Sequence, residues 1–504
     1  MKPFKMFSLV PGFFGCAILT FTSHILYEAV DLLSPSQQHQ APHKPFSDRQ
    51  SAIEDRWQFE FDMLKDPRTG RIPIGIRDRE IALARTLPTR EDVRALRGDI
   101  LNTYTVLGPG NLGGRTRAFA YDKLSASIML SGGVSSGIFR STNGGASWTN
   151  VTPADEIHNV TALAQDPRAG FESTWYYATG ESFGNSASLP GSFYFGHGMY
   201  KSTDNGLTWS KLTAYNTGTL EGFDSRRDFC HRIAINPTTG HIYAAVTNNI
   251  VRSTDGGTTW TGTPGVLGKS GSFSSAEVTD IICTSTGRLY AAFSGIAGNS
   301  TPTGTPPSTD LDGVWTSTTG AALSWTKIAG SGSATTPPGW NAAGIYRRVV
   351  LALAPSNEDI LYVLYDNLVV SDCAGVPAPE ADFFKWVQST STWTDRSANM
   401  PNEPGCSNGN DPFAIQGGYD IAIAVKPDDE NFVLIGGTNA YRSTDGFATT
   451  TATTRIGGYA GTGGYTEYTG HHPDIHVFRF HPTTPTTMVC GSDGGIHRTT
   501  GIAA

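Results

Sequence analysis

Three residues near the end of the chain combine side chains that can hold a metal ion. His472, Asp474 and His476 occupy alternate positions in a His-His-Pro-Asp-Ile-His segment that begins at residue 471. Alternate side chains of an extended strand point to the same side. Imidazole and carboxylate groups together suit a divalent metal. The spacing therefore favours a divalent-metal site, with a hydrogen-bonded polar strand entrance as the alternative; no other cofactor is indicated.

Aspartates stand where several apolar, strand-like runs begin, and they are candidates for catalytic carboxylates. The four are Asp228, Asp280, Asp420 and Asp474. An inverting glycoside hydrolase needs an acid and a base about 6.5–9.5 Å apart on either side of the sugar. These four residues are candidates only because of their position in the sequence. Because a sequence contains no distances, no catalytic pair can be chosen among them.

A second group of polar residues at the same strand starts is typical of ligand binding. The candidates are Arg115, Arg117, His231, Arg347, Arg348 and Asp420. Guanidinium groups bind carboxylates and phosphates through forked hydrogen bonds. A water-filled channel lined by polar groups, without any ligand, is the alternative interpretation.

A repeated unit that begins after residue 102 must position these side chains. Its clearest part is an octapeptide, Ser-x-Asp/Asn-x-Gly-x-Ser/Thr-Trp, with clean copies starting at Ser141, Ser202 and Ser253 and weaker copies at Ser317 and Ser443. The residues predicted to build these turns are Ser141, Asn143, Gly145, Trp148, Ser202, Asp204, Gly206, Trp209, Ser253, Asp255, Gly257, Trp260, Ser443 and Asp445. Another copy is expected near residue 371.

The chemistry of the octapeptide is local. A carboxylate or amide at the third position accepts hydrogen bonds from N–H groups of its own turn. Glycine at the fifth position adopts a backbone conformation that other residues resist. The Trp is expected to open the next strand and to fill the gap between neighbouring sheets. These roles are structural, so we do not expect the octapeptides to be catalytic.

Each octapeptide follows two strand-like runs, for example Arg232 to Pro237 and Ile242 to Val246. The octapeptide closes a third strand and its Trp opens a fourth, and four short strands make one propeller blade. We therefore predict an all-β, seven-bladed propeller whose last unit begins at His476. Residues 104–107 resemble the strand after the first octapeptide. They are predicted to complete the last blade and so to cover its exposed edge; the alternative is one part of a longer, two-propeller protein.

Three regions follow from these patterns. Residues 1–30 read as a signal peptide or signal anchor, because two lysines precede an apolar run. Residues 31–100 read as a linker and a short helical arm, with helical patterns at Asp78 to Thr86 and Thr89 to Leu96. Residues 101–504 form the propeller. The leader predicts a secreted or envelope-associated protein and leaves its cleavage or lipidation open.

Composition excludes several classes of protein. Glycine supplies 58 of 504 residues and charged residues only 16%, against about 25% in ordinary domains, which favours a turn-rich β protein. The net charge of −8 offers no positive field to nucleic acid. Cys230, Cys283 and Cys490 lie in apolar runs and are expected to be buried, whereas Cys373 and Cys406 flank an insertion where a disulfide would fit.

The octapeptides, the opening segment Leu107 to Arg117, and the later segments His472 to His476 and Ser492 to Ile496 resemble Asp-box, or BNR-repeat, propellers. The resemblance is to the sortilin-type and sialidase-like propellers of exported bacterial proteins and covers about residues 50–504. It implies the fold more than the function, because sialidases, xyloglucanase-type hydrolases, photosystem-assembly factors and sortilin receptors share the motif. A sialidase also needs a Tyr nucleophile with its Glu, and no such pair is recognisable.

The sequence thus predicts an exported propeller that binds a glycan or an envelope protein at its channel mouth. A glycoside hydrolase of xyloglucanase or sialidase type, using channel carboxylates, is the alternative. A carboxylate pair facing one cleft would favour the enzyme, whereas an arginine-rich or plugged channel would favour binding. We expect no nucleic-acid partner, and membrane contact only through an uncleaved leader.

Overall fold

The computed structural model describes the chain in segments. They are residues 57–59, 61–62, 64–86, 114–152, 159–183, 193–215, 217–219, 222–262, 265–269, 273, 277–295, 311–341, 344–369, 378–402, 413–459 and 467–503. The predicted leader, the helical pattern at 89–96, the closing strand at 104–107, and Cys373 and Cys406 lie outside them. Within these segments, no helix combines the length and the apolar character needed to cross a membrane.

The chain divides into two units, Met1–Leu64 and Lys65–Ala504. In the first unit the described residues 57–59, 61–62 and 64 are helical. The second unit contains helix α3 (Ile76–Ala84), which overlaps the helical pattern predicted from Asp78. None of the nine residues of α3 is buried.

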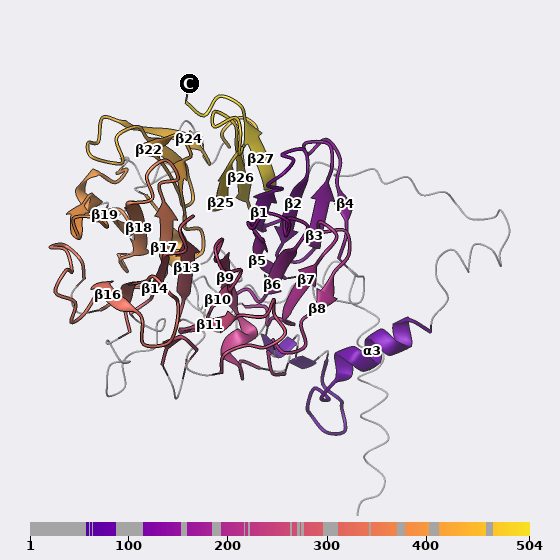
Figure 1. Cartoon of the computed structure of the whole chain (residues 1–504). Helices are drawn as coiled ribbons and strands as arrows, with labels where there is room; N and C mark the ends of the chain where they lie inside the picture. The colour runs from indigo at the N-terminus through magenta and orange to yellow at the C-terminus, as the bar shows by residue number, and fades with distance from the viewer. Residues whose placement is uncertain are drawn as a thin grey trace, which may run out of the picture. The chain divides into compact units, whose positions relative to one another are not determined.

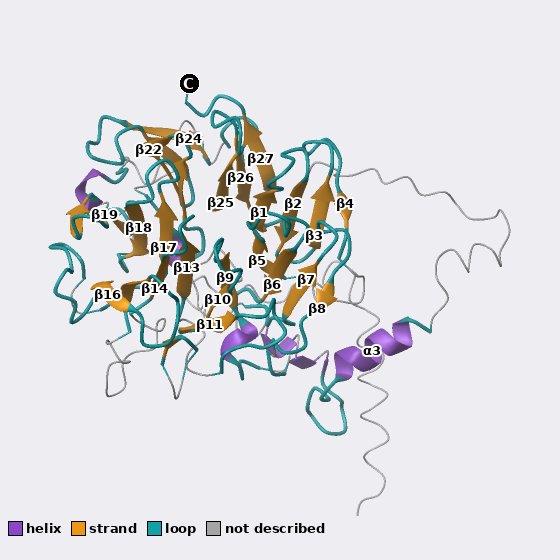
Figure 2. Cartoon of the chain, viewed as in Figure 1, coloured by secondary structure: helices purple, strands orange, loops and turns teal. Residues whose placement is uncertain are grey.

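Seven antiparallel sheets make up the rest of the second unit (Figure 2). The first sheet contains β1 (Thr116–Tyr121), β2 (Met129–Gly133), β3 (Gly137–Ser141) and β4 (Thr149–Asn150). The second contains β5 (Val160–Gln165), β6 (Trp175–Thr179), β7 (Met199–Ser202) and β8 (Ser210–Lys211). The third contains β9 (Cys230–Ile235), β10 (Ile242–Val246), β11 (Asn249–Ser253) and β12 (Leu267–Gly268).

The remaining sheets repeat this order. The fourth contains β13 (Thr279–Cys283), β14 (Leu289–Phe293), β15 (Gly313–Ser317) and β16 (Thr326–Ala329). The fifth contains β17 (Val349–Leu353), β18 (Ile360–Asp366), β19 (Ala381–Val387) and β20 (Thr392–Asp395). The sixth contains β21 (Ala422–Lys426), β22 (Asp429–Gly436), β23 (Ala440–Ser443) and β24 (Thr453–Gly457). The seventh contains β25 (Ile475–Phe480), β26 (Met488–Ser492) and β27 (Gly495–Thr499). Short 3₁₀ turns are η1 (Arg226–Asp228), η2 (Ser397–Asn399) and η3 (Gln416–Gly418).

The first strands of the seven sheets form a closed ring. They contact one another in the order β1, β5, β9, β13, β17, β21 and β25, and β25 contacts β1 again (Figure 1). The second unit is therefore a seven-bladed β-propeller, as predicted. The last blade has three strands among the described residues and the other six have four.

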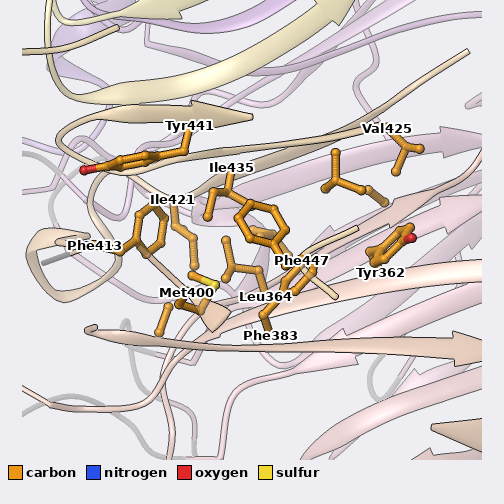
Figure 3. Packing of buried hydrophobic residues seen from close by; sticks show 14 of the residues in the cluster. Tyr362, Leu364, Phe383, Met400, Phe413, Ile421, Val425, Ile435, Tyr441 and Phe447 are labelled. Carbon is orange, nitrogen blue, oxygen red and sulfur yellow. The ribbon is translucent and has the colours of Figure 1, made fainter. Parts of the chain in front are cut away.

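Seven clusters of buried side chains hold the blades together, one in each gap between neighbouring sheets. Figure 3 shows the cluster between the fifth and sixth sheets, where Tyr362, Leu364 and Phe383 pack against Ile435 and Tyr441. All seven residues of β18 are buried, and its first six residues are accordingly aliphatic or aromatic. Because each gap has its own core, every blade depends on both neighbours.

The octapeptide turns form the local network that their residue types suggest. In the second turn, Ser202 Oγ donates to Asp204 Oδ1 at 2.7 Å, and Thr208 N donates to the same oxygen at 2.9 Å. The same serine Oγ accepts the Gly206 N–H at 2.9 Å. Equivalent serine bonds occur at residues 141–145, 253–257 and 443–447. Membership of the Asp-box family stays a prediction.

Two side chains show how these turns join neighbouring blades. Trp209 is 8% exposed and packs with Ala118 and Leu130 of the preceding sheet. In the turn after Ser443, Phe447 replaces the fifth-position glycine, with φ of 60°. Its ring packs edge-on against Phe383 of the fifth sheet, 5.1 Å between centroids. Since a bulky residue rarely adopts positive φ, this inter-blade contact compensates the strain.

The fifth blade corrects one expectation. An octapeptide was expected near residue 371, but the third strand of that sheet begins only at Ala381. The turn between its third and fourth strands is residues 388–391, Gln-Ser-Thr-Ser, with Ser391 at φ of 52°. This hairpin lacks the octapeptide. The spacing between the other copies therefore predicted the turn of the fifth blade at the wrong position. Cys230 and Cys490 are buried, Cys283 is partly buried, and all three are free.

Candidate functional site

The centre of the ring encloses a cavity of about 120 Å³, lined by the first strand of every sheet. Its polar lining residues are Arg117, Thr161, His231, Arg232, Thr279, Asp280, Arg348, His476 and Arg479. Small-molecule pockets usually measure about 300–1,000 Å³. The channel interior is therefore narrow and rich in arginine, and an arginine-rich channel is one of the features expected from the sequence to favour binding.

Arg117, the second residue of β1, occupies the entrance of the cavity. Its Nε donates to Glu181 Oε2 at 2.5 Å, and both side chains are almost fully buried, at 5% and 3% exposed. Nη1 donates to the carbonyl of Tyr419 at 2.7 Å, and Nη2 to that of Phe183 at 3.2 Å. One acid and two carbonyls thus hold this guanidinium in a single orientation.

Arg348, directly before β17, meets Arg117 at the same carbonyl. Its Nη1 donates to Gly418 O at 2.8 Å and to Tyr419 O at 3.3 Å. These carbonyls are presented by η3, where Gln416, Gly417 and Gly418 all have positive φ. Burial, and then the charge of Arg117, lower the pKa of Arg348 to about 9. Two guanidinium groups therefore lie side by side at the channel entrance.

Tyr419 joins a second network at this entrance. Its hydroxyl donates to Asp493 at 2.7 Å and accepts from Arg115 Nη1 at 2.7 Å. His476, whose side chain is fully buried, lies with Nε2 2.7 Å from Asp493 Oδ1. Burial, and the charge of Arg117, lower the pKa of His476 to about 3. The ring is therefore neutral at physiological pH, and its Nε2–H donates to the Asp493 carboxylate.

Two of the four candidate acids meet each other. Asp420 is fully buried and accepts from Thr438 Oγ1 at 3.2 Å, and Asp474 lies close enough to affect it electrostatically. Burial, and then the charge of Asp474, raise the pKa of Asp420 well above its ordinary value. Burial and the charge of Asp493 raise the pKa of Asp474 to about 6.

The other two candidate acids are engaged separately. Asp280 pairs with Arg232 Nη1 at 2.9 Å and accepts the Leu351 N–H at 2.9 Å. Asp228 accepts N–H groups from Asp224 at 3.0 Å and Ser225 at 2.8 Å, which caps η1. Burial raises the pKa of Asp228 to about 8. Each acid thus has a local structural role.

The expected metal set is not assembled. β25 begins only at Ile475, and Asp474 has φ of 63°, so His472 and Asp474 precede the strand. His472 Nδ1 lies 2.9 Å from Pro473 O, while His476 contacts Asp493. Throughout the described segments, no group of three or more His, Cys, Asp or Glu side chains could hold a metal ion. The alternation argument was wrong because it assumed an extended strand.

The expected ligand-binding residues do gather at one end of the ring. Arg117, His231 and Arg348 line the cavity, Arg115 contacts Tyr419, and Asp420 lies beside Asp474. Arg347 precedes β17, and its N–H donates to Asp366 O at 3.0 Å. Sequence reasoning missed Glu181, Tyr419 and Asp493. Glu181 follows β6, Tyr419 precedes β21, and Asp493 follows β26. The Ser-Asp-Gly-Gly segment containing Asp493 was the one visible signal.

Comparisons with known proteins identify the fold. Neither the family models nor the curated proteins compared with this chain give a match. Among solved structures, the GH74 xyloglucanase from Xanthomonas campestris is 16% identical, with a TM-score of 0.51 over 78% of this chain and 53% of that chain. An ancestral GH74 enzyme is 16% identical, with a TM-score of 0.50 over 79% of this chain and 46% of that chain.

The chain shares the propeller fold of these enzymes. It spans about half of their length. YCF48 from Cyanidioschyzon merolae is 13% identical, with a TM-score of 0.43 over 77% of this chain and 95% of that chain. At identities below 25% the likeness concerns the fold alone, because one propeller architecture carries many unrelated functions.

Proposed function

We propose that this chain is an exported propeller that binds a glycan or protein partner at its channel mouth and does not cleave it. The observation that carries the proposal is that the candidate catalytic acids already have hydrogen-bond or ion-pair partners within the protein. The candidate acids are bonded to an arginine, to polar side chains or to backbone N–H groups. The cavity between the blades holds only about 120 Å³.

The mouth offers groups suited to recognition. Phe183 lies against Arg348, with the guanidinium carbon 5.1 Å from the ring centroid. Arg115 lies 5.2 Å from the ring of Tyr419, and both arginines are partly exposed. Stacked guanidinium and aromatic planes bind carboxylates and flat polar surfaces. Because buried bonds hold these side chains, a partner pays little entropy to order them.

A glycoside hydrolase is the second candidate. In its favour, the chain shares the fold of two GH74 enzymes, and Asp420 and Asp474 have raised pKa values, as general acids do. Against it, Asp228 caps η1, Asp280 pairs with Arg232, and Asp420 is fully buried. We place the enzyme second for that reason.

The binding proposal is tested by co-sedimentation of the full chain with immobilised plant, bacterial and sialylated glycans. We expect one glycan class to deplete the chain from solution, and Arg115→Met to reduce depletion about tenfold, since a charge-assisted bond is lost. Arg140→Met, on β3 of the first sheet, is the matched control. Absence of depletion by every glycan, and of any captured envelope protein, would contradict the proposal.

A further inference from the structure

The central cavity carries more positive than negative charge. Four guanidinium groups line it, and two are neutralised: Arg117 by Glu181 and Arg232 by Asp280. For Arg348 and Arg479 the described part of the chain provides only carbonyl acceptors, Gly418 O and Tyr419 O for the former and Phe478 O for the latter. Two positive charges in the cavity thus lack an ion-pair partner.

The remaining acids nearby do not cancel this excess. Burial and the charge of Asp474 raise the pKa of Asp420 well above its ordinary value, which favours the uncharged form of this acid. Asp474, whose pKa is about 6, accepts from Gln416 Nε2 at 3.1 Å and is not one of the residues that line the cavity. Asp493 accepts from Tyr419 and His476 and interacts with Arg115. Burial and the nearby Arg232 also lower the pKa of Arg479 to about 10, so its charge persists at pH 7.

Three polar side chains, those of Arg117, Arg348 and His231, line the same cavity. Arg117 and Arg348 both donate to the Tyr419 carbonyl, at 2.7 and 3.3 Å, which brings their guanidinium groups together. His231, the second residue of β9, lines the same cavity. Its Nε2 is buried and has no hydrogen-bond partner within the described segments. A buried polar atom without a partner indicates a missing acceptor or an ordered water.

We propose that the channel binds one small tetrahedral oxyanion of the phosphate or sulfate class, held by Arg117, Arg348 and His231. Two unpaired positive charges match the charge of one dianion. Forked guanidinium donors match its oxygens, and Nε2–H of the neutral imidazole supplies a further donor. Arg479 adds positive potential from β25. The cavity volume admits such an ion and is below the range of sugar-sized pockets.

The anion site shares Arg348 with the proposed recognition surface, so the two proposals are separated by their ligands. The small anion is titrated alone, and the glycan or protein partner is tested by co-sedimentation. An anion in the channel would stabilise the seven first strands, because it offsets repulsion between arginines that belong to different blades. Anything that binds only the folded state raises its stability.

The test is isothermal titration calorimetry, in which the heat of binding is measured as sodium phosphate, sodium sulfate or sodium acetate is added to the full chain at constant ionic strength. We expect saturable binding of phosphate or sulfate at one site per chain, with acetate weaker. Arg348→Met should weaken the binding by about tenfold or more, since it removes a charge-assisted donor. Arg140→Met, which removes a guanidinium bonded to Asn205 O outside the channel, should leave binding unchanged.

A second variant guards against misfolding of the first. His231→Ala removes one donor without removing charge and should weaken phosphate binding severalfold, with circular dichroism confirming the fold. Three results would overturn the proposal. They are no saturable heat with phosphate or sulfate for the folded wild-type chain, acetate binding tighter than both, or folded Arg348→Met and His231→Ala variants that bind like the wild type.

Discussion

Aspartates in two regions of this propeller have opposite electrostatic environments. In the octapeptide turns, hydrogen bonds from Thr259 lower the pKa of Asp255 to about 2. Burial alone would raise the pKa of Asp204, but hydrogen bonds from Thr208 and Ser202 lower it to about 2. At the channel mouth, burial raises the pKa of Asp474 to about 6 and also raises the pKa of Asp420.

The difference separates residues that build the fold from residues that maintain a site. Turn carboxylates are charged, close to water and satisfied by donors within five residues. The pKa values of the carboxyl groups of Asp420 and Asp474 are raised mainly by burial between the sixth and seventh blades. Structures accept such unfavourable electrostatics where a site requires them. The same residue type is therefore informative only together with its surroundings.

The largest predicted effect concerns the channel ion pair. Arg117→Met leaves Glu181 buried without its partner, and we expect a loss of about 3–5 kcal/mol in the free energy of unfolding, measured by urea denaturation. Adding Glu181→Gln should recover part of the loss. If Arg117→Met cost no more than Arg140→Met, the buried pair would not be what holds the mouth together.

A smaller effect is expected in an octapeptide turn. Asp204→Ala removes the acceptor of the Thr208 N–H and Oγ–H, and should cost about 1–2 kcal/mol, as loss of a capping side chain does. Asp204→Asn should cost less, because Asn143 already fills this position in the first turn. The comparison uses urea denaturation at pH 7, and equal losses for Ala and Asn would show that an amide cannot replace the carboxylate there.

The smallest effect depends on pH and has opposite signs in the two regions. The folded-state pKa of Asp474, about 6, lies above the ordinary 3.8, so its protonated form is favoured by folding. The wild type therefore loses stability relative to Asp474→Asn as pH rises from about 4 to 6, with no further change above. We expect a difference on the order of 1 kcal/mol, since solvent screens part of the charge.

Asp204→Asn provides the matched opposite case. Its folded-state pKa of about 2 lies below 3.8, so the wild type should lose stability relative to this variant as pH falls from about 4 to 2. Urea midpoints measured across pH for both pairs test the contrast. If the stability difference between wild type and Asp474→Asn changed with pH in the same direction as that between wild type and Asp204→Asn, the distinction between turn and channel carboxylates would be wrong.

Much of the fold could be predicted because its signals are local. The octapeptide around Asp204 acts within eight residues, and its recurrence implies blades. The fifth blade escaped this reasoning because its turn at 388–391 has no octapeptide. The closing strand expected at 104–107 stays a prediction.

The site was only partly predictable. Arg117, His231 and Arg348 were identified because polar residues at the starts of apolar strands face a channel. The partners of the arginines could not be identified in the same way. Arg115 and Tyr419, for example, are 304 positions apart in sequence and meet only when the ring closes. The metal hypothesis failed at Asp474 because its positive φ breaks the alternation on which it rested.

The most direct test of the central claim is a search for cleavage products. The full chain and its Asp474→Asn variant are incubated with plant, bacterial and sialylated glycans, and the soluble fraction is analysed by mass spectrometry. A channel mouth that binds without catalysis predicts no new oligosaccharides from either chain. New oligosaccharides from the wild type that disappear with Asp474→Asn would contradict the account and make the carboxyl pair catalytic.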